Sequence, residues 1–291
     1  LNWAIGLELV HGSATLDRAL WRRAYSALYD TGVFTRSNLE NNYEVTSNHF
    51  LSNVVGLWFL GAVFADLPAG AEWLAFAQQS LEQEINVQVL PDGADYESSV
   101  PYHRLVTELF LGSARLGEFM RRPLSSHYRA RLHGMVAFLA SVTRPDGLMP
   151  QAGDADDGRL HVLSAYDKVS PQDGRHLFGP AAGMFNEPAW AALGGELAAW
   201  EAAWWGVDTP EARGDQPVPV SRLFPDAGLA VMRAHGSHYV LATNGIVGTK
   251  GFGNHKHNDL LSFEYHPSGI PLIVDPGSYV YTSDFDARNR F

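Results

Sequence analysis

Hydrophobic side chains recur every three to four residues through the first two thirds of the chain. This spacing places them on one face of a helix. Turn sequences such as the Pro-Asp-Gly at residues 91–93 separate the periodic segments. The pattern predicts helices with one buried face at residues 7–29, 45–64, 71–89, 101–120, 125–141 and 188–205.

The pattern changes after the last of these segments. Residues 206–220 hold three prolines among Gly, Asp and Glu, a composition typical of an exposed linker. Short, often β-branched runs follow, and they predict strands at residues 228–232, 238–243, 260–266 and 270–274. Helices followed by strands predict an α+β protein of two domains. We expect a helical domain at residues 1–210 and the beginning of an antiparallel β domain at residues 221–291.

The amino-acid composition excludes several classes of function. Hydrophobic residues make up 46 % of the chain and charged residues 18 %, an ordinary globular balance. The absence of cysteine excludes disulfides, thiol catalysis and cysteine-ligated metals. A net charge of −11 argues against a general affinity for nucleic acid, and no apolar run is long enough to span a bilayer. Because the chain starts at Leu1 and stops at Phe291 in an arginine-rich stretch, we expect a piece of a longer polypeptide.

The first polar cluster surrounds Asn48 and His49. On a helix these two residues would share faces with Ser52 and Asn53, where a core helix should carry apolar residues. The alternative is that they only flank a helix N-terminus capped by Thr46 or Ser47.

The second cluster precedes the fourth predicted helix. Pro101 suits a first helical turn, which places Tyr102 near the positive end of the helix dipole. That position favours a phenolate, the form that lets a tyrosine exchange protons. His103 is adjacent and must point elsewhere. The alternative for Tyr102 is an ordinary buried tyrosine with one hydrogen bond.

The third cluster contains His255, His257 and Asp259, which would share one face of an extended segment. Asp275 follows at the junction of a strand and a turn. Two imidazoles and a carboxylate suit zinc or a similar divalent ion. The His-x-His pair is weak evidence by itself, and Leu260 stands where a metallo-hydrolase pattern needs a histidine.

Taken together, these motifs resemble the heparinase II/III-like polysaccharide lyases, a family that includes alginate and exopolysaccharide lyases. The resemblance extends over essentially the whole chain and rests on the order and spacing of its motifs. It implies an incomplete (α/α) toroid followed by an antiparallel β-sandwich, here incomplete. The motifs are Ser47-Asn48-His49, Tyr96-Glu97-Ser98, Val100-Pro101-Tyr102-His103, Gly153-Asp154-Ala155-Asp156-Asp157, His255-Lys256-His257-Asn258-Asp259 and Asp275-Pro276-Gly277-Ser278-Tyr279.

The resemblance implies β-elimination at a uronic acid in an anionic polysaccharide or oligosaccharide. By this correspondence Asn48 neutralises the substrate carboxylate, and His49 is a helper or the base for one C5 epimer. Tyr102 is the acid, with the role of base also open to it. His255 is a proton acceptor or a partner of the carboxylate, and Tyr281 corresponds to a second tyrosine found in some members.

Other roles follow from the same resemblance. In members that hold a structural divalent metal, His257 and Asp275 would ligate it together with a later histidine that this chain does not reach. No organic cofactor is implied. A periplasmic or secreted location is expected on family grounds. Three further residues are expected to bind substrate: Glu97, His103 and Arg288.

Two other functions remain open. One is a non-catalytic carbohydrate-binding or assembly protein. The other is a glycoside hydrolase on an (α/α) toroid, for which Glu97 and Asp154 could supply the two carboxylates. Asp154 and its neighbouring aspartates are otherwise interpreted as structural. The net charge of −11 leans away from a heavily sulfated polymer. The lyase hypothesis requires Asn48, Tyr102 and His255 to converge on one cleft.

Overall fold

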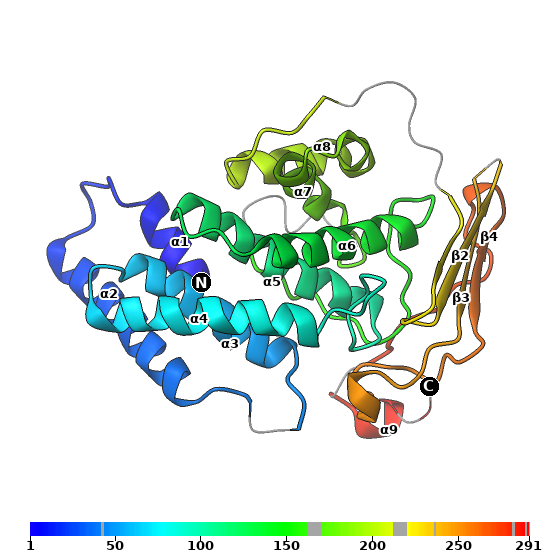
Figure 1. Cartoon of the computed structure of the whole chain (residues 1–291), viewed down its shortest axis with the longest axis horizontal. Helices are drawn as coiled ribbons and strands as arrows, with labels where there is room; N and C mark the ends of the chain where they lie inside the picture. Colours follow the sequence, from blue (N-terminus) through cyan, green and yellow to red (C-terminus); the bar gives the residue numbers. More distant parts are fainter. Residues whose placement is uncertain are drawn as a thin grey trace.

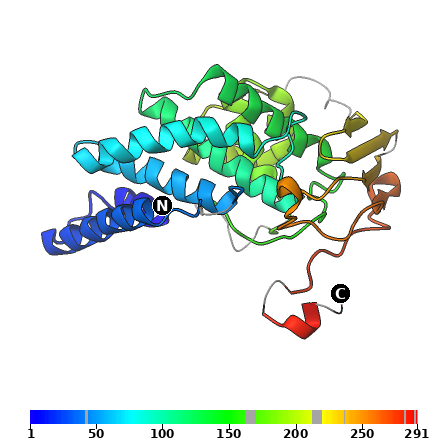
Figure 2. The same ribbon diagram turned by 60° about the horizontal axis from the view of Figure 1, so that its bottom comes forward.

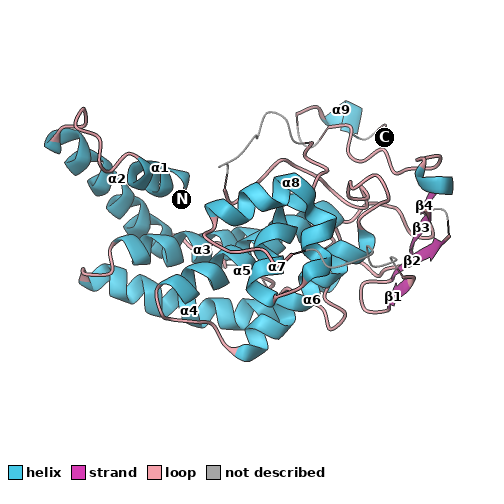
Figure 3. Cartoon of the chain, turned by 90° about the horizontal axis from the view of Figure 1, so that it is seen from above, coloured by secondary structure: helices cyan, strands magenta, loops and turns pink. Residues whose placement is uncertain are grey.

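The computed structural model of the chain describes residues 1–41, 44–161, 170–211, 220–235, 237–280, 283–288 and 290. Helices fill most of the molecule, and a small sheet stands at one end of the helical body (Figure 1). Figure 3 shows the same division from above, with the strands gathered at one edge. The predicted order of helices before strands is therefore confirmed.

The helices pack as neighbours along the chain. Consecutive helices form the pairs α3–α4, α5–α6 and α7–α8, and contacts of α3 with α5 and of α6 with α7 join one pair to the next. Five of the predicted helices are confirmed to within three residues at each end, namely α3, α4, α5, α6 and α8. The helices are α1 (Asn2–Leu9), α2 (Arg18–Ser37), α3 (Asn48–Val63), α4 (Pro68–Val87), α5 (Val100–Phe119), α6 (Ser126–Val142), α7 (Phe178–Phe185), α8 (Pro188–Trp204) and the short α9 (Phe285–Arg288).

Local sequence explains where several helices begin. The side chains of Ser47, Ser99 and Ser125 precede α3, α5 and α6, and each accepts a hydrogen bond from a backbone N–H in the first turn. Pro68 and Pro188 open α4 and α8, where the missing N–H costs nothing. The start of α3 and the start of α5 carry three of the predicted catalytic residues, Asn48, His49 and Tyr102, so these caps hold their backbone in place.

The core lies around α5, which is buried on most of its circumference. Its Phe110 is fully enclosed, as is Trp58 of α3. The Trp58 indole N–H donates to the carbonyl oxygen of Ser113 at 3.1 Å, which ties α3 to α5 through the interior. Complete burial of such large side chains makes this pair of helices a rigid support for the residues at their N-termini.

One helical prediction was wrong, and one helix was missed. The segment at residues 7–29 is divided into α1 and α2, because the Gly12-Ser13 stretch favours a turn and Asp17 starts a new helix by accepting from the Leu20 N–H at 2.6 Å. Helix α7 was not predicted, since it contains Gly179 and Pro180. Pro180 lies in its first turn, and a side chain at residue 179 would collide with the backbone of α8.

The sheet is antiparallel, with strands in sequence order β1 (Arg222–Phe224), β2 (Leu229–Ala234), β3 (His238–Thr243) and β4 (Phe263–His266). One face packs on the helices. Phe224 lies against Phe138 of α6 with ring centroids 4.7 Å apart, and the Tyr239 hydroxyl donates to the Val142 carbonyl at 2.9 Å. The sheet is thus fastened to the C-terminal end of α6.

The strand predictions were partly wrong. β1 was missed because it is only three residues long. β4 starts at Phe263, because Leu261 has a φ of 63° and breaks the extended run predicted from residue 260. Residues 270–274 form no strand, and only Ile273 bridges to Tyr265. The described residues thus contain one sheet of the expected β-sandwich.

Helix α8 ends at Trp204 and β1 begins at Arg222. Of the predicted linker between them, residues 212–219 lie outside the described residues, so the domain boundaries remain a prediction. Within the described ranges, no helix combines the length and the apolar character that crossing a membrane requires.

Candidate active site

Three segments far apart in the sequence meet at the N-terminus of α3. Asn48 is the first residue of that helix, and its backbone N–H and side-chain Nδ2 donate to the two oxygens of Glu97 at 2.6 and 2.9 Å. His255 Nε2 lies 3.2 Å from Glu97 Oε2 and 3.3 Å from Asn48 Nδ2. All three side chains are buried. Glu97 therefore fixes the orientation of both the amide and the imidazole.

A tight backbone crossing aligns these segments. The Asp154 N–H donates to the His255 carbonyl at 2.9 Å, and the Ser99 hydroxyl donates to the Asp154 carbonyl at 2.6 Å. Gly153 has a φ of +86°, and a Cβ there would lie 2.7 Å from Ser99 Cα. Both the positive φ and the lack of space for a Cβ require glycine at this position. The crossing holds the loop after α6 between the start of α5 and the segment that carries His255.

His255 is held as a cation. Burial alone would lower its pKa, but the hydrogen bonds that its ring donates to Asp154 and Glu97 outweigh that effect and raise the pKa to about 9. Nδ1 lies 3.3 Å from Asp154 Oδ2, so the two ring nitrogens face different carboxylates. At neutral pH both nitrogens carry a proton and donate.

Tyr102 lies directly on this imidazolium. The two rings are stacked, with centroids 3.7 Å apart and planes 13° from parallel. The Tyr102 hydroxyl donates to Asp156 Oδ2 at 3.0 Å, while its backbone N–H donates to the capping Ser99 hydroxyl at 3.2 Å. The structure therefore brings Asn48, Tyr102 and His255 into one cluster. Whether this cluster opens onto the cleft that the lyase hypothesis requires stays a prediction.

Asp154 is a member of the cluster that sequence reasoning interpreted as structural. Its Oδ1 lies 2.9 Å from His257 Nε2, and Ser278 Oγ lies within 3.3 Å of both groups. Burial would raise the pKa of Asp154, but its bonds to the two histidines outweigh this and hold it well below the usual range. The bond to Asp154 also raises the pKa of His257. Its place in the Gly-Asp-Ala-Asp motif was the signal that could have identified it.

His103 points away from the cluster into the core. Its Nδ1 accepts from the Asp95 backbone N–H, and its Nε2 donates to the Met135 carbonyl, both at 3.0 Å. Burial lowers its pKa to about 4, so it is neutral. Both nitrogens are engaged within the protein and its exposed fraction is 1 %. This placement does not support the predicted substrate-binding role. Glu97, predicted for the same role, is fully buried behind Asn48.

The remaining predicted catalytic and substrate-binding residues lie outside the cluster or outside the described residues. His49 is exposed and pairs with Glu40, with Nδ1 2.8 Å from Oε2. Tyr281 lies outside the described residues, as does the side chain of Arg288. The backbone of Arg288 ends α9, which Figure 2 shows well away from the helical body.

Among the described residues, both predicted metal ligands bind other protein groups. His257 Nε2 is bonded to Asp154, and Asp275 Oδ1 accepts from the Gly277 N–H at 2.8 Å. In the described part of the chain, no three His, Asp or Glu side chains are grouped to hold an ion. A structural metal therefore remains a prediction, and no step of the chemistry below passes through it.

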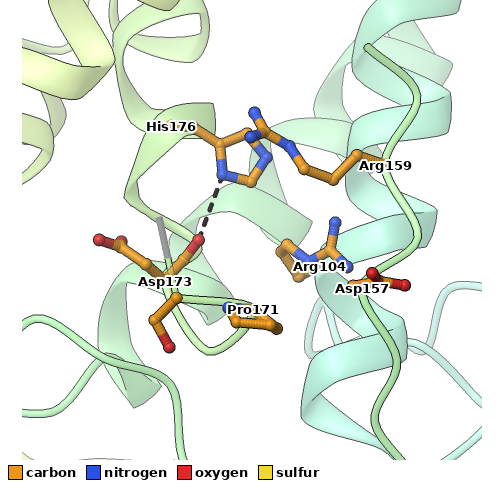
Figure 4. A pocket seen from close by; sticks show the side chains of 7 residues that line it. Arg104, Asp157, Arg159, Pro171, Asp173 and His176 are labelled. Carbon is orange, nitrogen blue, oxygen red and sulfur yellow. Dashed lines mark hydrogen bonds between the residues drawn. The ribbon is translucent and has the colours of Figure 1, made fainter. Parts of the chain in front are cut away.

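A polar cavity of about 110 Å³ lies on the other side of α5. Figure 4 shows Arg104, Arg159 and His176 directed toward it. The arginines are balanced, because Arg104 pairs with Glu108 at 3.3 Å and Arg159 with Glu201 at 3.1 Å. Burial opposes ionisation of Glu108, but His176, whose Nε2 lies 3.7 Å from Glu108 Oε1, and the charge of Arg104 outweigh this and lower the pKa of Glu108 to about 2. Both arginines of the cavity wall are therefore neutralised by buried glutamates.

Comparisons with known proteins find two curated relatives that are named lyases. A heparin-sulfate lyase of Bacteroides stercoris is 26 % identical over 253 residues, which are 85 % of this chain and 34 % of that protein. A heparin-sulfate lyase of Pedobacter heparinus is 28 % identical over 140 residues, which are 46 % of this chain and 21 % of that protein. The chain thus spans about a third or less of the curated relatives it matches.

Solved structures show the same fold. A crystal structure of heparinase III superposes with a TM-score of 0.74 at 19 % identity, covering 97 % of this chain and 42 % of that one. The heparan sulfate lyase from Pedobacter heparinus gives a TM-score of 0.67 at 18 % identity, covering 98 % and 41 %. The expected fold class, an incomplete helical toroid followed by antiparallel β structure, is confirmed by these similarities.

Two family models match the chain. The model described as "Heparinase II/III N-terminus" matches residues 33–174, and the one described as "Heparinase II/III-like, C-terminal" matches residues 216–291. The first contains Asn48, Tyr102 and Asp154, and the second contains His255. Between them the two models cover most of the chain, which therefore belongs to the heparinase II/III-like family.

Proposed function

We propose that this chain carries the catalytic centre of a polysaccharide lyase that cleaves a uronate-containing polysaccharide by β-elimination. The observation that carries the proposal is the cluster of Asn48, Tyr102 and His255, drawn from α3, α5 and the segment before β4. The names of the two curated relatives support it. Because the chain spans only part of those relatives, the activity of the whole protein is itself part of the proposal.

Charge neutralisation is the first requirement of this chemistry. The proton at C5 of a uronate is weakly acidic while the neighbouring carboxylate is charged, so cations or donors must stabilise the developing enolate. The Asn48 amide and the His255 imidazolium lie 3.3 Å apart and would face the substrate carboxylate together. Glu97 orients both groups without reaching solvent itself.

Proton transfer is assigned to Tyr102. His255 is protonated at neutral pH and therefore a poor base, which leaves the phenolate of Tyr102 to remove the C5 proton. The electron pair of the C5–H bond then forms the C4–C5 double bond, and the bond from C4 to the glycosidic oxygen breaks. The leaving oxygen takes its proton from Tyr102. The imidazolium, whose ring centroid lies 3.7 Å from that of Tyr102, favours the phenolate, whereas the Asp156 carboxylate, 3.0 Å from the hydroxyl, opposes it.

Heparan sulfate is the first substrate to test, because both curated relatives are named heparin-sulfate lyases. Alginate, hyaluronan and acidic bacterial exopolysaccharides offer the same uronate chemistry. A periplasmic or secreted location, where such polymers are met, belongs to the same proposal.

The hydrolase alternative has a geometric difficulty. Glu97 and Asp154 both bind the same imidazole, at His255 Nε2 and Nδ1 respectively, at 3.2 and 3.3 Å. The two carboxylates of a hydrolase must flank a glycosidic bond, whereas here the ring of His255 occupies the space between them. This arrangement favours elimination over hydrolysis.

Ultraviolet absorbance tests the proposal directly. The chain is incubated with each polymer, and the C4–C5 unsaturated product is followed as rising absorbance. A rise with at least one polymer is the expected result. New reducing ends without any rise in absorbance would replace the lyase by a hydrolase. Binding of a polymer with neither signal, by folded protein, would favour the carbohydrate-binding alternative.

A further inference from the structure

A groove of about 640 Å³ lies where the sheet meets the helices, and it contains none of the catalytic residues. Ser141 and Thr143 at the end of α6 and Trp190 of α8 form its helical wall. Arg222 of β1 and Arg233 of β2 form the opposite wall. Figure 1 shows α6 running up to the sheet at this point, while the segment around residue 250 that leads to His255 lies below the sheet. We call this the basic groove.

The basic groove differs in charge from the rest of the protein. Its wall contains arginine and histidine but no Asp or Glu among the described residues, although the chain carries a net charge of −11. Arg144 also lines it, but that guanidinium is neutralised by Asp146 at 2.6 Å. The excess positive charge therefore belongs to Arg222 and Arg233.

Arg233 is a half-buried cation without an acidic partner among the described residues. Its Nη2 donates to the carbonyl oxygens of Ser141, at 2.8 Å, and Thr143, at 2.5 Å, and its guanidinium lies 4.8 Å from the ring centroid of Tyr239. Its Nε has no hydrogen-bond partner in the described structure. By contrast, Arg104 and Arg159 in the polar cavity each pair with a glutamate. A charge held in this way attracts an anion from outside.

Arg222 brings a second charge to the same place. In the ladder it pairs with Val231, so it lies diagonally across from Arg233 on the sheet face turned toward the helices. Arg222 is exposed and makes no ion pair in the described structure. Two like charges at diagonal positions repel each other, and an anion between them relieves that repulsion.

We propose that the basic groove binds an acidic stretch of the polysaccharide chain, through its sulfate or carboxylate groups, away from the cluster of Asn48, Tyr102 and His255. The inference rests on the proposed function for the identity of the anion, because a polymer with a charge on most sugars extends well beyond the sugars being cleaved. Arg222 and Arg233 bind the charged groups, and Ser141 of the helical wall and Ser237 of the turn between β2 and β3 line the groove to meet sugar hydroxyls.

Charge reversal tests the groove. Arg222→Glu is compared with Arg22→Glu, which makes the same change of charge at another exposed arginine, on α2. The probe is a heparin-derived decasaccharide, and its Kd is measured by calorimetry at two salt concentrations. We expect Arg222→Glu to weaken binding roughly tenfold and to reduce the salt dependence, while Arg22→Glu changes Kd less than about twofold. Equal effects of the two variants would overturn the proposal. Thermal melts confirm that both variants are folded.

Two further measurements separate this proposal from the proposed function. Arg222→Glu should raise the ratio of the KM for a long polymer to the KM for a tetrasaccharide, and Arg22→Glu should leave that ratio unchanged. Elimination with an unaltered ratio and unaltered Kd would overturn the groove and leave the lyase standing. Absence of elimination together with binding that depends on Arg222 would overturn the lyase and leave the groove standing. Polyglutamate that binds as tightly as the decasaccharide would overturn the assignment to a glycan.

Discussion

His255 and His103 are both buried at the start of α5, yet the first is a cation and the second is neutral. The pKa of His255 is raised to about 9, and that of His103 is lowered to about 4. Burial acts in the same direction on both rings, so the difference comes from their partners. His255 lies between the carboxylates of Glu97 and Asp154, whereas His103 bonds to a backbone N–H and a backbone carbonyl. One ring is a fixed cation of the site, and the other is part of the core.

The largest loss of activity is expected from a change at Tyr102, which stacks on the His255 ring. Tyr102→Phe removes only the hydroxyl that donates to Asp156, so the fold and the stacking on His255 should remain. Elimination should fall by a factor of about 10² to 10⁴, the usual contribution of an acid–base group. The absorbance assay measures the rate, and circular dichroism checks the fold. Normal turnover by the variant would refute the assignment of Tyr102.

The charge of His255 can be tuned through Asp154. If elimination needs the imidazolium, activity should fall as pH rises through about 9. Asp154→Asn removes one of the two carboxylates, lowers the pKa of His255 and moves this alkaline limb to lower pH. The stability that the proton on His255 provides is present below about pH 6.5 and is likewise lost toward pH 9.

The pH–rate profiles of the two proteins, together with an NMR titration of the imidazole, measure the shift. Asp66→Asn, which alters an exposed carboxylate in the turn after α3, is the matched control and should leave the profile unchanged. An alkaline limb that does not move in Asp154→Asn would mean that His255 does not carry the charge that matters.

His103 should behave as a residue of the core. His103→Gln moves the acceptor and the donor to other positions, so we expect at least one of the bonds to the Asp95 N–H and the Met135 carbonyl to be lost. This should lower the free energy of unfolding by about 1–3 kcal/mol. Because its folded pKa lies below that of the unfolded chain, the native protein should also lose stability as pH falls from about 6.5 toward 4. The His103→Gln variant should lack this part of the stability loss at low pH.

Urea melts at pH 7 and pH 5 measure both effects of His103→Gln. The turnover number of the folded variant should stay close to that of the native protein. A large rise in KM with unchanged stability would instead restore the substrate-binding role that the sequence predicted.

The smallest effect is expected at His49. This side chain is exposed and pairs with Glu40 at the surface, so His49→Ala should change the free energy of unfolding by less than about 1 kcal/mol. Elimination on polymers of either C5 epimer should fall by less than about tenfold, below the usual range for a proton-transfer group. Rates on glucuronate and iduronate polymers, measured side by side, check this. Loss on one epimer alone would identify His49 as its base.

Much of the fold was predictable because its determinants are local. The serine caps and apolar periodicity of α3, α5 and α6 can be read from a few consecutive residues. Prediction failed where packing overrode local preference. Gly179 and Pro180 obscured α7, although that helix needs the glycine to approach α8. The left-handed φ of Leu261 shortened β4 in a run that looks like a strand.

By itself, the sequence determined the order of helices before strands and the residue types able to perform elimination, since periodicity and motifs are properties of neighbouring residues. Only the tertiary structure decided what each of those residues does. It placed Asp154 and Glu97 on either side of His255, which lies 101 residues from Asp154 in the chain, and it turned His103 into the core. Charge state depends on partners brought together from distant segments, and no local pattern encodes those contacts.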